Sequence, residues 1–141
     1  MLILTIDPGS KPGYCLAHTD PFKILCVSSA WPRPLDRHTV IVERPGLRPG
    51  AKINPNSVVT LAITAGVQAG EAATRAERLV WLTPKQWKNN LYRNGISVVK
   101  SVFLNRLRRD LSPFYEGLEY CTDDQVDAIG IAWAVSKGGL L

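Results

Sequence analysis

The chain has 141 residues, a length that fits one domain with a core large enough to need neither disulfides nor structural metals. Its 17 Lys and Arg residues exceed its 12 Asp and Glu residues, and the resulting net charge of +5 favours an anionic partner such as nucleic acid. The three cysteines lack the spacing of a zinc site, and no apolar run reaches the ~18 residues of a membrane helix, so we expect reduced thiols and a cytoplasmic protein.

Short β-prone runs dominate the first part of the chain. Residues 2–6, 13–18 and 23–28 each predict a strand, and the tight connections between them favour an antiparallel meander. The first run ends at Asp7, directly before a Pro-Gly turn. Asp7 is therefore expected at the end of a strand.

A fourth strand follows an extended segment. Residues 32–38 cannot be helical because two prolines lie close together, and the β-branched run 39–43 ends at Glu43. Residues 44–54 are rich in Gly, Pro and basic side chains, which predicts a positively charged loop beside Glu43.

A long helix is predicted from Asn54 or Asn56 to about Arg78. Apolar and small residues recur along one side of it, and the glycines among them would let another backbone approach closely. These residues are Val59, Ile63, Gly66, Val67 and Gly70. This side can pack on the sheet or form a dimer interface.

Residues 79–82 predict a fifth strand. Thr83 then looks like an N-cap, with Pro84 at the first helical position and Gln86 completing a capping box. The helix that they open is short because Asn94-Gly95 ends it.

Ser97 is expected to cap the next helix, which closes before Pro113. Four of its residues are predicted to face the core: Val99, Val102, Phe103 and Leu107. Its basic residues should project elsewhere: Lys100, Arg106, Arg108 and Arg109.

The last helix begins with a second capping box, formed by Thr122 and Gln125, and ends near Gly138. It is apolar nearly all round, so we expect it to be buried against the sheet. The large aromatic residues are interpreted as core packing and not as base-stacking platforms: Trp81, Trp87, Trp133 and Phe103.

Two acids on the last helix are candidates for metal binding. Asp124 and Asp127 are three residues apart, which places both carboxylates on one face. Asp124 could instead be an ordinary acid at a helix N-terminus, but an uncompensated Asp127 on a buried helix would cost several kcal/mol. Together with Asp7 and Glu43 they supply the hard oxygen ligands that Mg²⁺ or Mn²⁺ prefers. The alternative of four scattered structural acids stays open at this point.

Three landmarks resemble the RuvC-like Holliday-junction resolvases of the RNase H superfamily. These are Ile6-Asp7-Pro8-Gly9 with Gly13 shortly after, Glu43 after an apolar strand, and Asp124-x-x-Asp127-Ala128-Ile129. The ordered set of four acids is the specific part, since an Asp-x-Gly turn also occurs in actin-like ATPases and sugar kinases. The compact length is similar to that of a phage-encoded form.

The resemblance implies an α/β RNase H-like fold, a mixed five-stranded sheet flanked by α-helices. It implies that Asp7, Glu43, Asp124 and Asp127 bind two Mg²⁺ or Mn²⁺ ions and cut DNA, leaving 5′-phosphate and 3′-hydroxyl ends. Lys100 would stabilise charge near the scissile phosphate, although a solvated surface lysine is an equally good interpretation. The family's helices that correspond to the one with Gly66 and Gly70 form a homodimer, which suits paired nicking of a four-way junction.

The sequence departs from the family in the loop after Glu43, where the resemblance leads us to expect an aromatic side chain that stacks into the junction. No aromatic residue occurs between Arg44 and Val80. Leu47 is the candidate for an apolar wedge between bases. The candidates for phosphate contacts are Arg44, Arg48, Lys52 and Lys100.

Three other functions compete with junction resolution. An endonuclease with looser choice among branched DNAs, such as flaps and forks, keeps the same chemistry and is favoured by the missing aromatic residue. A nucleotide-binding protein of the actin-like type needs a second domain, for which 141 residues leave no space. A non-catalytic nucleic-acid-binding module would leave the four acids with structural roles only.

Overall fold

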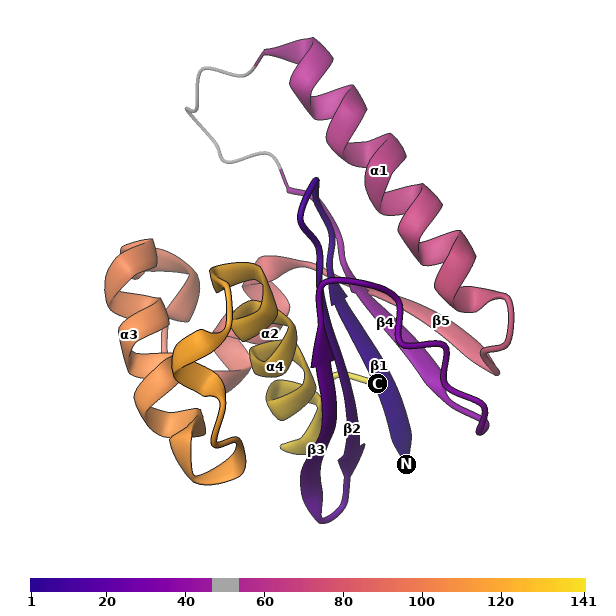
Figure 1. Cartoon of the computed structure of the whole chain (residues 1–141). Helices are drawn as coiled ribbons and strands as arrows, with labels where there is room; N and C mark the ends of the chain where they lie inside the picture. Colours follow the sequence, from indigo (N-terminus) through magenta and orange to yellow (C-terminus); the bar gives the residue numbers. More distant parts are fainter. Residues whose placement is uncertain (47–53) are drawn as a thin grey trace.

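The computed structural model describes residues 1–46 and 54–141 as a five-stranded sheet with helices on both faces (Figure 1). The strands are β1 (Leu2–Asp7), β2 (Gly13–Thr19), β3 (Phe22–Ser28), β4 (Thr39–Glu43) and β5 (Arg78–Leu82). The helices are α1 (Pro55–Ala73), α2 (Pro84–Leu91), α3 (Lys100–Leu111) and α4 (Asp123–Ser136), with 3₁₀ turns at Gly95–Ser97, Ser112–Phe114 and Leu118–Tyr120. None of these helices, in the described part of the chain, is long and apolar enough to cross a membrane.

The sheet has the order β3-β2-β1-β4-β5 and combines both kinds of strand pairing. β2 is antiparallel to β1 and β3, whereas β4 is parallel to β1 and β5 is parallel to β4. The predicted mixed sheet with an antiparallel meander first is therefore confirmed. Each strand also begins and ends within one residue of its prediction.

Side chains that alternate along the strands point to opposite faces of the sheet and pack into two separate hydrophobic cores. Ile3 and Ile41 point to the face covered by α2, α3 and α4, while Leu4 and Val40 point to the face crossed by α1 (Figure 1). The α4 face is the larger core because α4 is buried along most of its length, as its apolar composition predicts.

Helix α1 is shorter than predicted and ends at Ala73 instead of Arg78. The chain must turn there because β5 begins at Arg78, which pairs with Thr39 of β4. The backbone N–H of Glu77 donates a 2.9 Å hydrogen bond to the carbonyl of His38, so the turn is already tied to the sheet. No Gly or Pro in the sequence marks this helix end.

The side of α1 that packs on the sheet consists of alanines, Ala65, Ala69 and Ala72. The predicted apolar side points the other way, and the side chains of Val59, Ile63 and Val67 are 57% to 64% exposed. The alternative that this side of α1 packs on the sheet is therefore wrong.

Helix α3 begins at Lys100, and Ser97 lies in the preceding 3₁₀ turn instead of capping it. Its buried residues are Phe103, Leu104, Leu107 and Leu111. Val99 and Val102, predicted to face the core, are exposed. Val99 precedes the first turn, and Val102 is rotated one residue away from the buried stripe.

Of the aromatic residues assigned to the core, Trp87 and Phe103 are buried and Trp133 is half-buried. Trp81 is 41% exposed, so its assignment to the core is wrong. It lies on β5, the edge strand, where the sheet has no further neighbour to cover it.

Candidate active site

The four predicted acids line one cavity of about 590 Å³. Asp7 comes from the end of β1, Glu43 from the end of β4, and Asp124 and Asp127 from the first two turns of α4. The structure thus brings together residues that are more than a hundred positions apart in the sequence.

Strand register explains how the first two acids meet. Because β1 and β4 are parallel and Ile6 pairs with Val42, Asp7 and Glu43 follow at the same edge of the sheet. Two contacts then bring α4 to that edge. Thr5 Oγ1 donates a 2.6 Å hydrogen bond to the carbonyl of Ala128, and a Cβ on Gly13 would overlap the backbone of Asp124. Only glycine allows this approach, which gives Gly13 of the motif a structural reason.

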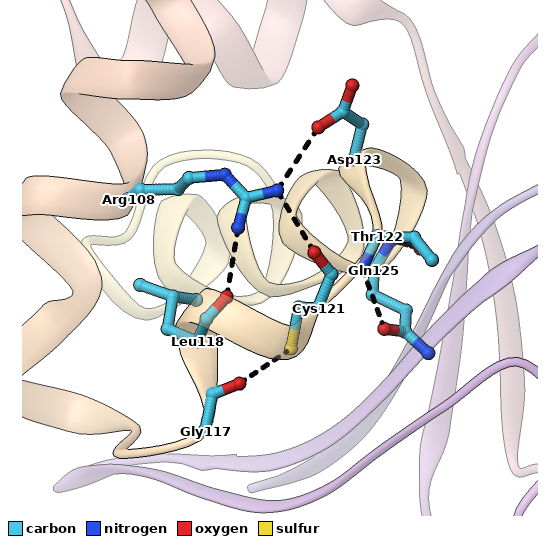
Figure 2. A network of polar contacts seen from close by, with 7 residues as sticks. All are labelled: Arg108, Gly117, Leu118, Cys121, Thr122, Asp123 and Gln125. Atoms are coloured by element: carbon cyan, nitrogen blue, oxygen red, sulfur yellow. Dashed lines mark hydrogen bonds and ion pairs between the residues drawn. The ribbon is translucent and has the colours of Figure 1, made fainter.

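The first turn of α4 is held from the other side by Arg108 of α3. Figure 2 shows its guanidinium donating to the carbonyl of Leu118 at 2.9 Å, to the carbonyl of Cys121 at 3.0 Å and to Asp123 at 3.1 Å. Since Asp123 directly precedes Asp124, Arg108 helps to fix the end of the helix that carries the acids.

Asp7 and Asp127 are buried, each 7% exposed, whereas Glu43 and Asp124 are half-buried. Burial first, then the charges of Glu43, Asp127 and Asp124 and a hydrogen bond with Asp124, raise the pKa of Asp7 to about 9. Burial is also the largest cause that raises the pKa of Asp127 to about 7 and the pKa of Glu43 above its ordinary value. Such a cluster favours a bound cation that compensates its charge.

The donor set fits a hard divalent ion such as Mg²⁺ or Mn²⁺. The carboxylate oxygen Oδ1 of Asp127 is buried and has no hydrogen-bond partner among the described residues, so a ligand position is free there. As placed, however, no group of three or more His, Cys, Asp or Glu side chains in the described ranges converges closely enough to hold an ion. All four carboxylates nevertheless line the same cavity. Binding would require their side chains to rotate inward.

Three lysines line the cavity beside the acids: Lys85, Lys88 and Lys100. Of these, Lys100 is predicted from the sequence, whereas Lys88 of α2 is not. Lys88 and Lys100 both lower the pKa values of Glu43 and Asp127 and so oppose the effect of burial. No local pattern identifies Lys88, because its place depends on the parallel register of β4 and β5: the N-cap of α2, Thr83, directly follows Leu82, the neighbour of Glu43.

A second residue that the sequence does not identify is Trp87, for which the apolar pattern predicts packing. Its indole Nε1–H donates a 2.6 Å hydrogen bond to Oε2 of Glu43. Among the causes that act on Glu43, this bond is the largest that lowers its pKa. Nothing in the apolar pattern of α2 distinguishes this role from packing.

The predicted DNA contacts are only partly placed. Arg44 is exposed and lines a different cavity, together with Trp81, so it does not join the acids. Leu47, Arg48 and Lys52 lie outside the described residues.

No family model and no curated protein matches the sequence. Two solved structures of RuvC from Thermus thermophilus match the fold. The first is 20% identical with a TM-score of 0.60, and the match covers 97% of this chain and 94% of that chain. The second, RuvC in complex with Holliday junction substrate, is 19% identical with a TM-score of 0.56 and covers 97% and 93%. A likeness at this identity establishes the fold, so the RNase H-like fold is confirmed.

Proposed function

We propose that this chain is one nuclease domain of the RuvC type that resolves Holliday junctions with the help of divalent metal ions. The observation that carries the proposal is the meeting of four acids and three lysines in one cavity at the edge of an RNase H-like sheet. Support also comes from the fold, which is that of RuvC, a protein solved in complex with a Holliday junction substrate.

The acids and the lysines of the cavity have different proposed roles. Asp7, Glu43, Asp124 and Asp127 would hold two Mg²⁺ or Mn²⁺ ions. When bound, such ions activate a water and stabilise the leaving oxygen of a phosphodiester. Lys100 would bind the scissile phosphate and stabilise the charge that develops on it. The products would carry 5′-phosphate and 3′-hydroxyl ends.

The loop after β4 would hold the DNA backbone beside the cavity. Arg44, Arg48 and Lys52 are the proposed phosphate contacts, and Leu47 is the proposed wedge between bases. Arg44 is the one of these that the structure describes, and its exposed side chain is free to reach a phosphate.

The exposed side of α1 supports a homodimer. It carries Val59, Ile63 and Val67 with Gly66 and Gly70, and no other element of the described residues comes within 4 Å of a Cβ built on either glycine. A two-fold dimer through this side would present two cavities to one four-way junction and allow paired symmetric nicks.

A looser preference among branched DNAs is the second candidate, favoured by the lack of an aromatic residue between Arg44 and Val80. Incubation of the wild-type chain with Mg²⁺ and labelled four-way junction, fork, flap and linear duplex separates the two. Junction resolution predicts two nicks at symmetric positions of the junction and little cutting of the other DNAs. Equal cutting of the junction, the forks and the flaps would favour the second candidate, an endonuclease with a looser preference among branched DNAs. Binding without cutting of any DNA would leave a non-catalytic module.

A further inference from the structure

Trp87 contacts an acid of the site directly although it lies in the core. Its indole N–H reaches Oε2 of Glu43 at 2.6 Å, and its side chain has no exposed surface. Water therefore does not compete for the N–H, and the bond fixes one carboxylate oxygen while the other stays free.

The rest of the indole ring is held by α3 and α4. It stands edge-on to Phe103, with ring centroids 5.5 Å apart and the planes at 76°. A Cβ on Gly130 would come within 3.0 Å of its Cζ3 atom, so this glycine makes room for the ring. Gly130 lies three residues after Asp127 on α4. One rigid ring thus links α4, which carries two acids, to β4, which carries Glu43.

The start of α2 determines where this ring lies. Thr83 caps the helix, and its side chain and that of Gln86 satisfy each other's backbone N–H groups. Because the cap follows Leu82, the register partner of Glu43, the first turn of α2 places Trp87 next to that carboxylate. Lys88 lies over the same ring, with its Nζ 5.2 Å from the centroid.

We propose that Trp87 is a positioning residue that orients the carboxylate of Glu43 for metal binding, an inference that rests on the proposed function of the site. The Oε2 atom accepts the hydrogen bond from the indole N–H, which leaves Oε1 of this cavity-lining residue available to a cation. Hydrogen-bond partners of metal ligands act in this way by restricting the ligand to the productive orientation. A large aromatic side chain without an N–H would fill the same space but lose this role.

Mn²⁺ binding to the wild-type chain and to Trp87→Phe, measured by calorimetry without DNA, tests the inference. Phenylalanine retains an aromatic ring in the core and removes the donor. We expect the variant to bind Mn²⁺ about tenfold more weakly, at the lower end of the range for loss of such a partner. On a four-way junction, kcat should fall while KM changes less than about twofold, because Trp87 is buried and does not reach DNA.

Trp133→Phe is the matched control. It also replaces a tryptophan by phenylalanine in the α4 core, but Trp133 packs against Tyr92 and Phe114, away from Glu43. Mn²⁺ affinity should stay unchanged in this variant. An equal loss in both variants would mean that general packing, and not the hydrogen bond, supports the site.

The indole N–H resonances of the metal-free wild-type chain give a test that does not depend on folding of the Trp87 variant. Glu43→Ala should shift one of the four indole resonances upfield and speed its exchange with water. No change in any of them would overturn the inference. Weaker Mn²⁺ binding by Trp87→Phe in a chain that cuts no DNA would retain the inference and reject the proposed function. Unchanged Mn²⁺ binding in a chain that cuts junctions would do the reverse.

Discussion

The carboxyl group of Asp7 lies among three other acids with little access to water. Its ordinary pKa of 3.8 is raised to about 9, first by burial and then by the neighbouring charges. Between about pH 4 and pH 9, the folded metal-free chain therefore keeps a proton that the unfolded chain has released. In this window the folded chain binds more protons than the unfolded chain. The free energy of unfolding therefore falls as the pH rises through it.

Asp7→Asn removes this ionisation and should stabilise the metal-free chain at pH 8. We expect a gain of at least about 1 kcal/mol in the free energy of unfolding, the equivalent of a single pKa unit. Chemical denaturation at pH 5 and pH 8 in the presence of EDTA measures it. The gain should be smaller at pH 5, and added Mg²⁺ should stabilise the wild type but not the variant. A destabilised variant at pH 8 would contradict the repulsion among the acids.

Lys100→Ala should lower the rate of junction cleavage, on the order of 10²-fold, the usual cost of losing one group that stabilises developing charge. Single-turnover cleavage measures this effect directly. Lys85→Ala is the control, since Lys85 lines the same cavity but, unlike Lys100, is not among the largest causes that shift the pKa of Glu43 or Asp127. An equal fall of the cleavage rate in both variants would mean that Lys100 only attracts DNA by its charge and does not stabilise the scissile phosphate.

Among the elements, the strands and the burial of α4 were predictable, whereas the buried side of α1 was not. Alternation and β-branched runs determine the strands locally, so each was predicted within one residue. The exposed apolar side of α1 carries the same periodic signal as a buried side, and its alanines give a weaker signal although they pack on the sheet. The sequence alone therefore could not decide whether the stronger stripe packs on the sheet or faces outward.

Arg108 connects α3 to the start of α4 and should contribute to stability. Arg108→Ala would leave the carbonyls of Leu118 and Cys121 without this donor, and hydrogen bonds to charged groups contribute about 1.5–3 kcal/mol. We expect a loss of about 2 kcal/mol in the free energy of unfolding. Arg109→Ala, which removes a surface ion pair with Asp110, should change it by less than about 0.5 kcal/mol. Similar losses in both variants would show that the network in Figure 2 does not stabilise the α4 end.

The exposed side of α1 predicts the oligomeric state. Val67→Asp places a charge in the centre of that side and should convert a dimer to a monomer in light scattering coupled to gel filtration. Ser57→Asp, at an exposed position of the same helix outside that side, should leave the dimer intact. A wild-type chain that is monomeric at all concentrations would contradict the proposed homodimer.

At the scale of the whole molecule, the site was predictable as a set of residues but not as a geometry. The four acids could be named because their order and spacing resemble a known family, and the fold brings them to one cavity. Trp87 and Lys88 could not be named, because their roles depend on the parallel register of β4 and β5 and on where α2 starts. Local patterns carry no information about which distant strand will be the neighbour.

Single-turnover cleavage of a labelled four-way junction with Mg²⁺ by the wild type, Asp7→Asn and Asp127→Asn tests the proposed active site most directly. We expect paired nicks by the wild type and a loss on the order of 10³-fold or more in both variants, with junction binding retained. Because Asp7→Asn is expected to stabilise the fold, its loss of cleavage would not reflect unfolding. Cleavage that persists in both folded variants would contradict the assignment of these acids to the active site.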